Sequence, residues 1–167
     1  MNDSNATNDE ADCRRHMAAK TVLRAVTHNY LNKSYRHGPF LVRLTDITIP
    51  NIFVDKDWNF TGIVDLEWLC AMPPESLNVR AWLGNGWALE QIKDEHVDEF
   101  DTVRKEFMEA FTEEQNKTYH TLAWPLAQIL EENWKTRGLW FWSCLWTVNA
   151  ATYLVEDQIV PHFLLAF

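Results

Sequence analysis

The chain has 167 residues, of which 47% are hydrophobic and 13% aromatic, and its formal net charge at pH 7 is −9. This composition supplies the apolar material for one packed domain and excludes a generally disordered chain. The acidic balance argues against nucleic acid and against an anionic membrane surface as partners, because both attract concentrated Lys and Arg.

The N-terminal segment, residues 1–15, is polar and acidic, and we expect it to be a disordered tail. It contains no apolar stretch of the kind found in secretory signal peptides. The cysteines Cys13, Cys70 and Cys144 lie far apart and form no CxxC pair, which favours a reducing compartment over a disulfide framework or a zinc site. We therefore expect a cytoplasmic location.

An amphipathic helix is predicted over residues 16–32, where apolar side chains recur every four or five positions. Short β-prone segments follow at residues 40–44, 52–54 and 61–64. The polar run at residues 55–59 separates the last two of these segments and predicts a hairpin turn.

The rest of the chain is expected to be helix and loop, with apolar stripes that predict helices through residues 97–111 and 122–134. Residues 138–154 are apolar on all sides and rich in Trp, which predicts a buried core helix. A membrane span would need a longer segment, and an aromatic cage for a quaternary amine is the other alternative. Together the elements predict an α+β domain that is mostly helical.

Three polar residues lie around the predicted hairpin in a pattern that suits phosphoryl transfer. Asp46 and Asn51 are five positions apart on the loop between two β-prone segments, and Asp65 ends the next strand. Such chemistry needs a carboxylate at the acceptor hydroxyl and hard oxygen ligands for magnesium, held on a rigid support. The alternative is that these residues only cap a loop and end a strand.

Two motifs carry a family resemblance. Residues 44–51 read LTDITIPN and residues 62–68 read GIVDLEW. They resemble the His-Gly-Asp-x-x-x-x-Asn loop and the following Ile-Asp-Phe/Trp-Glu motif of the aminoglycoside phosphotransferase and choline-kinase-like family, especially its fungal members. The resemblance implies the C-terminal lobe of a protein-kinase-like fold over residues 16–167, with Mg²⁺ and ATP as cofactors. It also implies Asp46 as the catalytic base, Asn51 and Asp65 as magnesium ligands, and a hydroxyl of a small, amine-bearing molecule as the phosphate acceptor.

The sequence departs from the family pattern at two places. Leu44 stands where the family has a loop-orienting His, and no glycine precedes Gly38, so the glycine-rich loop over the phosphates is missing. We therefore expect a C-terminal lobe without its nucleotide-binding lobe, inactive as an isolated chain. A pseudokinase-like binding or scaffold module and a truncated gene product are the alternatives. The sequence does not indicate the oligomeric state.

Two further acidic features each allow two interpretations. Glu67 lies two residues after Asp65, so both would face one way on an extended segment, and Glu67 either shares a metal or bonds a neighbouring backbone group or Arg. A run of acidic residues begins before the helix predicted at 97–111 and continues into it. The run is interpreted as a solvated helix face or, alternatively, as a docking surface for a cationic substrate. Its members are Glu90, Asp94, Glu95, Asp98 and Glu99.

Overall fold

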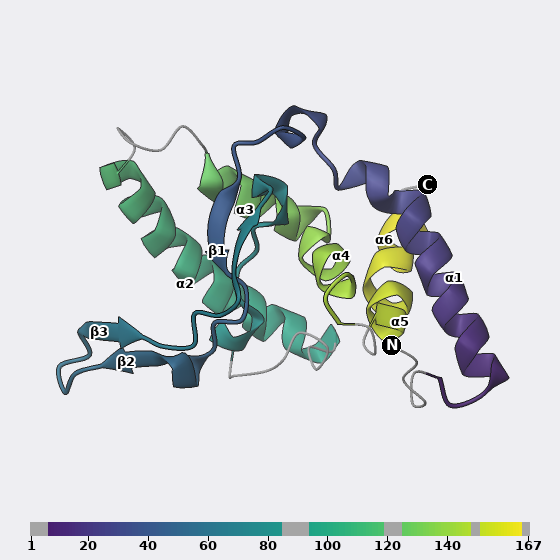
Figure 1. Cartoon of the computed structure of the whole chain (residues 1–167), viewed down its shortest axis with the longest axis horizontal. Helices are drawn as coiled ribbons and strands as arrows, with labels where there is room; N and C mark the ends of the chain where they lie inside the picture. Colours follow the sequence, from purple (N-terminus) through teal and green to yellow (C-terminus); the bar gives the residue numbers. More distant parts are fainter. Residues whose placement is uncertain (1–6, 85–93, 119–124, 148–150, 165–167) are drawn as a thin grey trace.

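Figure 1 shows a computed structural model of the chain, which describes residues 7–84, 94–118, 125–147 and 151–164. A first helix leads through a strand-rich segment into a second group of helices, which confirms the mostly helical α+β class. The helices described are α1 (Glu10–Val26), α2 (Asp94–Thr118), α3 (Leu126–Lys135), α4 (Gly138–Cys144), α5 (Ala151–Leu154) and α6 (Val160–Leu164), with a π-helical segment (Val155–Ile159) before α6. The strands described are β1 (Leu41–Leu44), β2 (Ile52–Val54), β3 (Phe60–Ile63) and β4 (Leu69–Met72).

The first helix begins and ends earlier than the apolar periodicity predicts. Asp9 caps it, because its side chain accepts a hydrogen bond from the backbone N–H of Asp12 at 2.8 Å. Residues 10–15 are therefore helical, which corrects the expectation of a disordered tail for that stretch, and residues 1–6 lie outside the described residues. The α-helix ends at Val26 and continues only as the 3-10 turn Thr27–Asn29, short of the predicted end at residue 32.

The strands form two separate antiparallel pairs. Strand β2 pairs with β3, and the turn predicted between them is confirmed, because the backbone N–H of Asp55 donates to the carbonyl of Asn59 at 2.9 Å. Strand β1 pairs instead with β4, in a register that places Leu41 opposite Met72. Strand β4 has no alternating pattern and was not predicted. Because β4 pairs with β1, the segments that lead into β2 and out of β3 both lie at the Leu44 end of β1.

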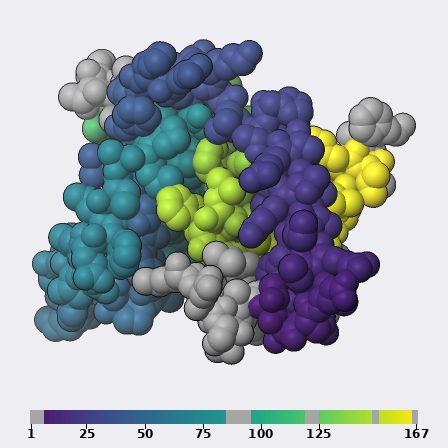
Figure 2. Space-filling view, turned by 45° about the vertical axis from the view of Figure 1, so that its right-hand side comes forward, coloured from purple at the N-terminus to yellow at the C-terminus, as the bar shows by residue number. Residues whose placement is uncertain are grey.

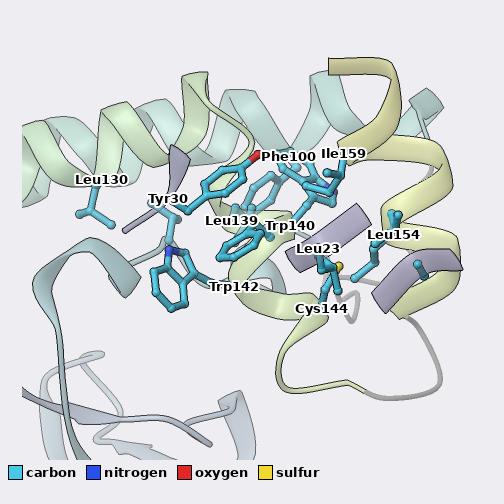
Figure 3. Packing of buried hydrophobic residues seen from close by; sticks show 14 residues of the cluster. Leu23, Tyr30, Phe100, Leu130, Leu139, Trp140, Trp142, Cys144, Leu154 and Ile159 are labelled. Carbon is cyan, nitrogen blue, oxygen red and sulfur yellow. The ribbon is translucent and has the colours of Figure 1, made fainter. Parts of the chain in front are cut away.

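The core lies among the helices rather than under the strands. Tyr30 stacks on Phe141 with ring centroids 4.0 Å apart, and Trp140 is fully buried, as Figure 3 shows for the surrounding cluster. Helix α1 packs against α5 and the π-helical segment. In Figure 2, yellow-green atoms of the α4 region lie between purple α1 and the teal segment that carries the strands. The Trp-rich segment therefore serves mainly as core.

The Trp-rich segment is not the single helix that its composition predicts. Helix α4 ends at Cys144, where the N–H groups of Leu145 and Trp146 bond carbonyls three residues back and tighten the last turn. Helix α5 covers Ala151–Leu154, and residues 148–150 before it lie outside the described residues. Among the described residues, no helix has the length and apolar character needed to cross a bilayer.

Candidate functional site

The loop that carries Asp46 is held by side chains from a distant part of the chain. The guanidinium of Arg80 donates hydrogen bonds to the carbonyl of Leu44 and, at 3.0 Å, to the carbonyl of Thr45. On the other side of Asp46, the indole N–H of Trp82 donates to the carbonyl of Ile47 at 2.7 Å. The backbone is thus fixed before and after Asp46, while the Asp46 side chain remains exposed.

Asn51 lies between Asp46 and Asp65 and contacts the backbone of both neighbourhoods. Its side-chain amide N–H group lies 3.5 Å from the carbonyl oxygen of Asp46, a long hydrogen bond. The backbone carbonyl of Asn51 accepts a hydrogen bond from the backbone N–H of Val64 at 3.0 Å. Because the amide nitrogen faces Asp46, the amide oxygen of Asn51 is available as a ligand.

Asp65 has a backbone conformation that most residues avoid. Its φ is +60°, in the left-handed region, which costs free energy for any residue with a Cβ atom, although Asp and Asn tolerate it best. Trp58 and Arg137 also have a positive φ. Trp58 lies in the turn of the β2–β3 hairpin and Arg137 lies in the connection between α3 and α4, so turns account for both. Conformational outliers of this kind cluster at functional sites. The exposed Asp65 carboxylate thus stands at a strained position directly after Val64.

The two hydrogen bonds of Asn51 place the backbones of Asp46 and of Val64, the residue before Asp65, next to Asn51 at the base of the β2–β3 hairpin. Asp65 offers carboxylate oxygens and Asn51 offers an amide oxygen, which are donors of the kind that Mg²⁺ takes, and the carboxylate of Asp46 is left for the base. No group of three or more His, Cys, Asp or Glu side chains is placed to hold a metal within the described ranges. Any magnesium here would therefore have few protein ligands and would keep waters or phosphate oxygens, as this ion commonly does.

The other acidic features do not join this site. Glu67 is exposed, and across the part of the chain that the structure describes it bonds neither a backbone group nor an Arg. Asp98 lies on the exposed side of α2, which fits a solvated face. Glu90 lies outside the described residues, as do the side chains of Asp94 and Glu95.

A cavity of about 450 Å³ opens beside Asp46. The loop of Asp46 forms one side, the segment that carries Arg80 and Trp82 forms a second, and Trp142 of α4 and Trp146 form a third. A second cavity of about 500 Å³ shares part of this lining, namely Arg43, Thr45, Asp46, Arg80, Ser143 and Trp146. The two hollows are therefore neighbouring parts of one groove.

Two partly buried guanidinium groups line this groove. Burial lowers the pKa of Arg43 to about 10, and the nearby charge of Arg80 contributes to the decrease. Burial likewise lowers the pKa of Arg80, and the negative charge of Asp46 opposes that decrease. At neutral pH both groups are cations.

The residues that shape the groove were not found by sequence reasoning. Arg80 and Trp82 follow the loop by about 35 positions and match no motif, so only their hydrogen bonds reveal them. Arg43 is the one polar residue of β1 and lies in an apolar run without alternation, so the sequence did not mark it either.

Comparison with known proteins adds no relative. No family model matches the chain, and no curated protein and no solved structure shows a significant similarity to it.

Proposed function

We propose that this chain supplies the catalytic loop and metal-binding residues of a phosphotransferase of the aminoglycoside phosphotransferase type, with the fold of a kinase C-terminal lobe. Asp46 accepts the proton of the acceptor hydroxyl, and Asn51 and Asp65 hold Mg²⁺. The observation that carries the proposal is a pair of hydrogen bonds made by Asn51. Its side-chain amide donates to the backbone carbonyl of Asp46 at 3.5 Å, and its backbone carbonyl accepts from the N–H of Val64 at 3.0 Å. These contacts bring the two motifs next to each other, which supports a shared site.

Each residue type suits its role. The carboxylate of Asp46 is exposed beside a cavity large enough for a small molecule, which suits a group that must meet an acceptor hydroxyl. Magnesium, when bound, would neutralise the phosphate oxygens of ATP during transfer. The oxygen ligands of Asn51 and Asp65 are of the kind this ion prefers.

The main alternative is a non-catalytic binding module that keeps the loop but not the reaction. Its sequence arguments are the missing glycine-rich loop and Leu44, which cannot orient the loop by a side-chain hydrogen bond. Arg80 provides such orientation from another element by binding the carbonyls of Leu44 and Thr45. The loop is therefore positioned despite Leu44, which removes that argument for the alternative. Because the glycine-rich loop is missing, we still expect the chain to be inactive by itself.

Manganese provides a direct test of the metal role, because Mn²⁺ takes the same oxygen ligands and free Mn²⁺ is counted by electron paramagnetic resonance. We expect the chain to bind Mn²⁺ and the variant Asp65→Asn to bind it at least about tenfold more weakly. Asp46→Asn should keep most of the binding, since Asp46 is the base. Asp57→Asn, which changes an exposed carboxylate in the hairpin turn, is the matched control. Equal affinity of the Asp65→Asn variant and the unchanged chain would overturn the metal assignment.

A further inference from the structure

The groove beside Asp46 contains more positive than negative charge. The charged residues that line its two hollows are Arg43, Asp46 and Arg80, so two cations face one carboxylate and the local sum is +1. Most of the remaining lining is apolar or aromatic, which lowers the local screening and strengthens the field at the cations. The lining therefore favours an anion over a cation.

The guanidinium groups also have hydrogen-bonding capacity to spare. Arg43 donates two bonds, to the carbonyl of Ser76 and, at 2.8 Å, to its hydroxyl. Arg80 donates two bonds to the loop carbonyls of Leu44 and Thr45. Each guanidinium has five N–H groups, so three on each have no partner among the described residues. Planar N–H groups of this kind are the usual partners of carboxylates and phosphates.

The position of the groove indicates which molecule supplies the anion. Neither Asn51 nor Asp65, the proposed metal ligands, lines either hollow. The groove instead extends from Asp46 toward α4, where Trp142 and Ser143 lie. The metal side and the groove side of Asp46 are thus different, and the groove is on the side open to an acceptor rather than to the metal-bound phosphates.

Resting on the proposed function, we infer that the phosphate acceptor carries an anionic group, a carboxylate or a phosphate, beside an apolar body of about the size of a ring. Arg43 and Arg80 bind the anion, and the indole rings of Trp82, Trp142 and Trp146 cover the apolar body. This acceptor has the opposite charge to the amine-bearing molecule that the family resemblance implies.

The test uses the whole chain and three probes that share a benzyl group, namely phenylacetate, benzylamine and benzyl alcohol. Binding is followed by tryptophan fluorescence, since Trp68, Trp82, Trp142 and Trp146 line the groove, and by calorimetry. With EDTA present, so that no metal takes part, phenylacetate should bind at least about tenfold more tightly than benzylamine and should weaken at high salt. Equal or tighter binding of benzylamine would overturn the inference.

Variants locate the anion. Arg43→Gln should weaken phenylacetate binding about fivefold or more, and Arg43→Lys should weaken it less. Arg36 is exposed and lies outside the groove, so Arg36→Gln should leave the binding unchanged. Asp46→Asn should tighten it, because a negative charge beside the anion is removed; a purely structural role of these residues would not produce that increase. Unchanged affinity in both Arg43→Gln and Asp46→Asn would contradict the inference, and the wild-type comparison of probes still decides if Arg43→Gln fails to fold.

A last measurement separates the acceptor from the nucleotide as the source of the anion. Tripolyphosphate carries the phosphates of a nucleotide without its base, and it should not displace phenylacetate. Displacement would assign the two Arg residues to the nucleotide and overturn the inference. None of these measurements needs bound metal or turnover, so failure of the anion site and failure of the phosphotransferase proposal are distinguished by the manganese titration.

Discussion

The guanidinium of Arg80 donates a hydrogen bond to the carbonyl of Thr45 at 3.0 Å, immediately before Asp46 in the chain. A residue 35 positions away thus fixes the loop that bears the proposed base. The bond is charge-assisted and partly buried, so both the stability of the loop and the placement of the Asp46 carboxylate depend on it.

Replacement of Arg80 should therefore cost stability. Arg80→Ala removes charge-assisted bonds to two carbonyls and is expected to lower the free energy of unfolding by about 2–3 kcal/mol. Urea denaturation measures this change. Arg36→Ala, at an exposed arginine, is the matched control and should stay within about 0.5 kcal/mol of the unchanged chain. If the two variants were equally stable, the bonds from Arg80 would not hold the loop.

Replacement of Asp65 by Gly should preserve or raise the stability of the fold while it removes metal binding. Its φ of +60° is favourable for Gly, so Asp65→Gly is expected to be as stable as the unchanged chain or more stable by up to about 1 kcal/mol. The same variant should lose Mn²⁺ binding, because the carboxylate is gone. Thermal unfolding and the manganese titration measure the two effects on one sample. A clear loss of stability in Asp65→Gly would mean that the carboxylate has a structural role instead.

Gly138 is needed for the packing of Asn133. A Cβ atom at Gly138 would lie 2.5 Å from the side-chain oxygen of Asn133, whose amide group donates to the carbonyls of Glu75 and Leu77 at 2.9 and 2.6 Å. Gly138→Ala should therefore displace Asn133 and destabilise the fold by about 2 kcal/mol or more. Gly62→Ala is the control, since nothing lies within 4 Å of the added atom there. Similar unfolding curves for both variants would contradict this packing.

Arg104 should make the fold sensitive to acid. It is buried, with its guanidinium 2.7 Å from carboxylate oxygens of Asp101 and of Glu131, which joins α2 to α3. The Arg104 hydrogen bond lowers the pKa of Glu131 below its ordinary 4.5. Burial would raise the pKa of Asp101, but hydrogen bonds from Lys105 and Arg104 outweigh it and lower that pKa below 3.8.

Because both carboxyl groups have lower pKa values in the folded chain than in the unfolded one, their stabilisation is present above about pH 4.5 and is lost as the pH falls through the folded values. Arg104→Met should be less stable at neutral pH by about 2 kcal/mol and should lose less further stability on acidification. Urea denaturation at several pH values between about 6 and 3 measures both slopes. Parallel pH profiles for the variant and the unchanged chain would show that these pairs do not contribute.

Local patterns in the sequence were sufficient to predict the parts of the fold that depend on neighbouring residues. The hairpin of β2 and β3 follows from the polar turn between two apolar runs, and α2 follows from its apolar stripe. Strand β4 depends on pairing with β1, whose residues lie about 25–30 positions earlier, so its own composition gave no signal. The break after Cys144 likewise depends on the tertiary packing of a segment that is apolar throughout.

The candidate site divides in the same way. Asp46, Asn51 and Asp65 were predicted because they lie within two short motifs, and the structure joins these motifs through Asn51. Arg80 and Trp82 contact the loop only through folding of the segment after β4, so no spacing rule links them to Asp46. The groove and its surplus of positive charge became visible only once these long-range contacts were known.

The location of bound Mn²⁺ tests the central claim most directly, because a paramagnetic ion broadens the nuclear magnetic resonance signals of the backbone amides closest to it. With substoichiometric Mn²⁺, the amides of Asp46, Asn51 and Asp65 should broaden first, and the effect should disappear in Asp65→Asn while persisting in Asp57→Asn. Broadening centred on the hairpin turn at residues 55–59 or on the exposed face of α2, and unchanged by Asp65→Asn, would contradict the proposed metal site.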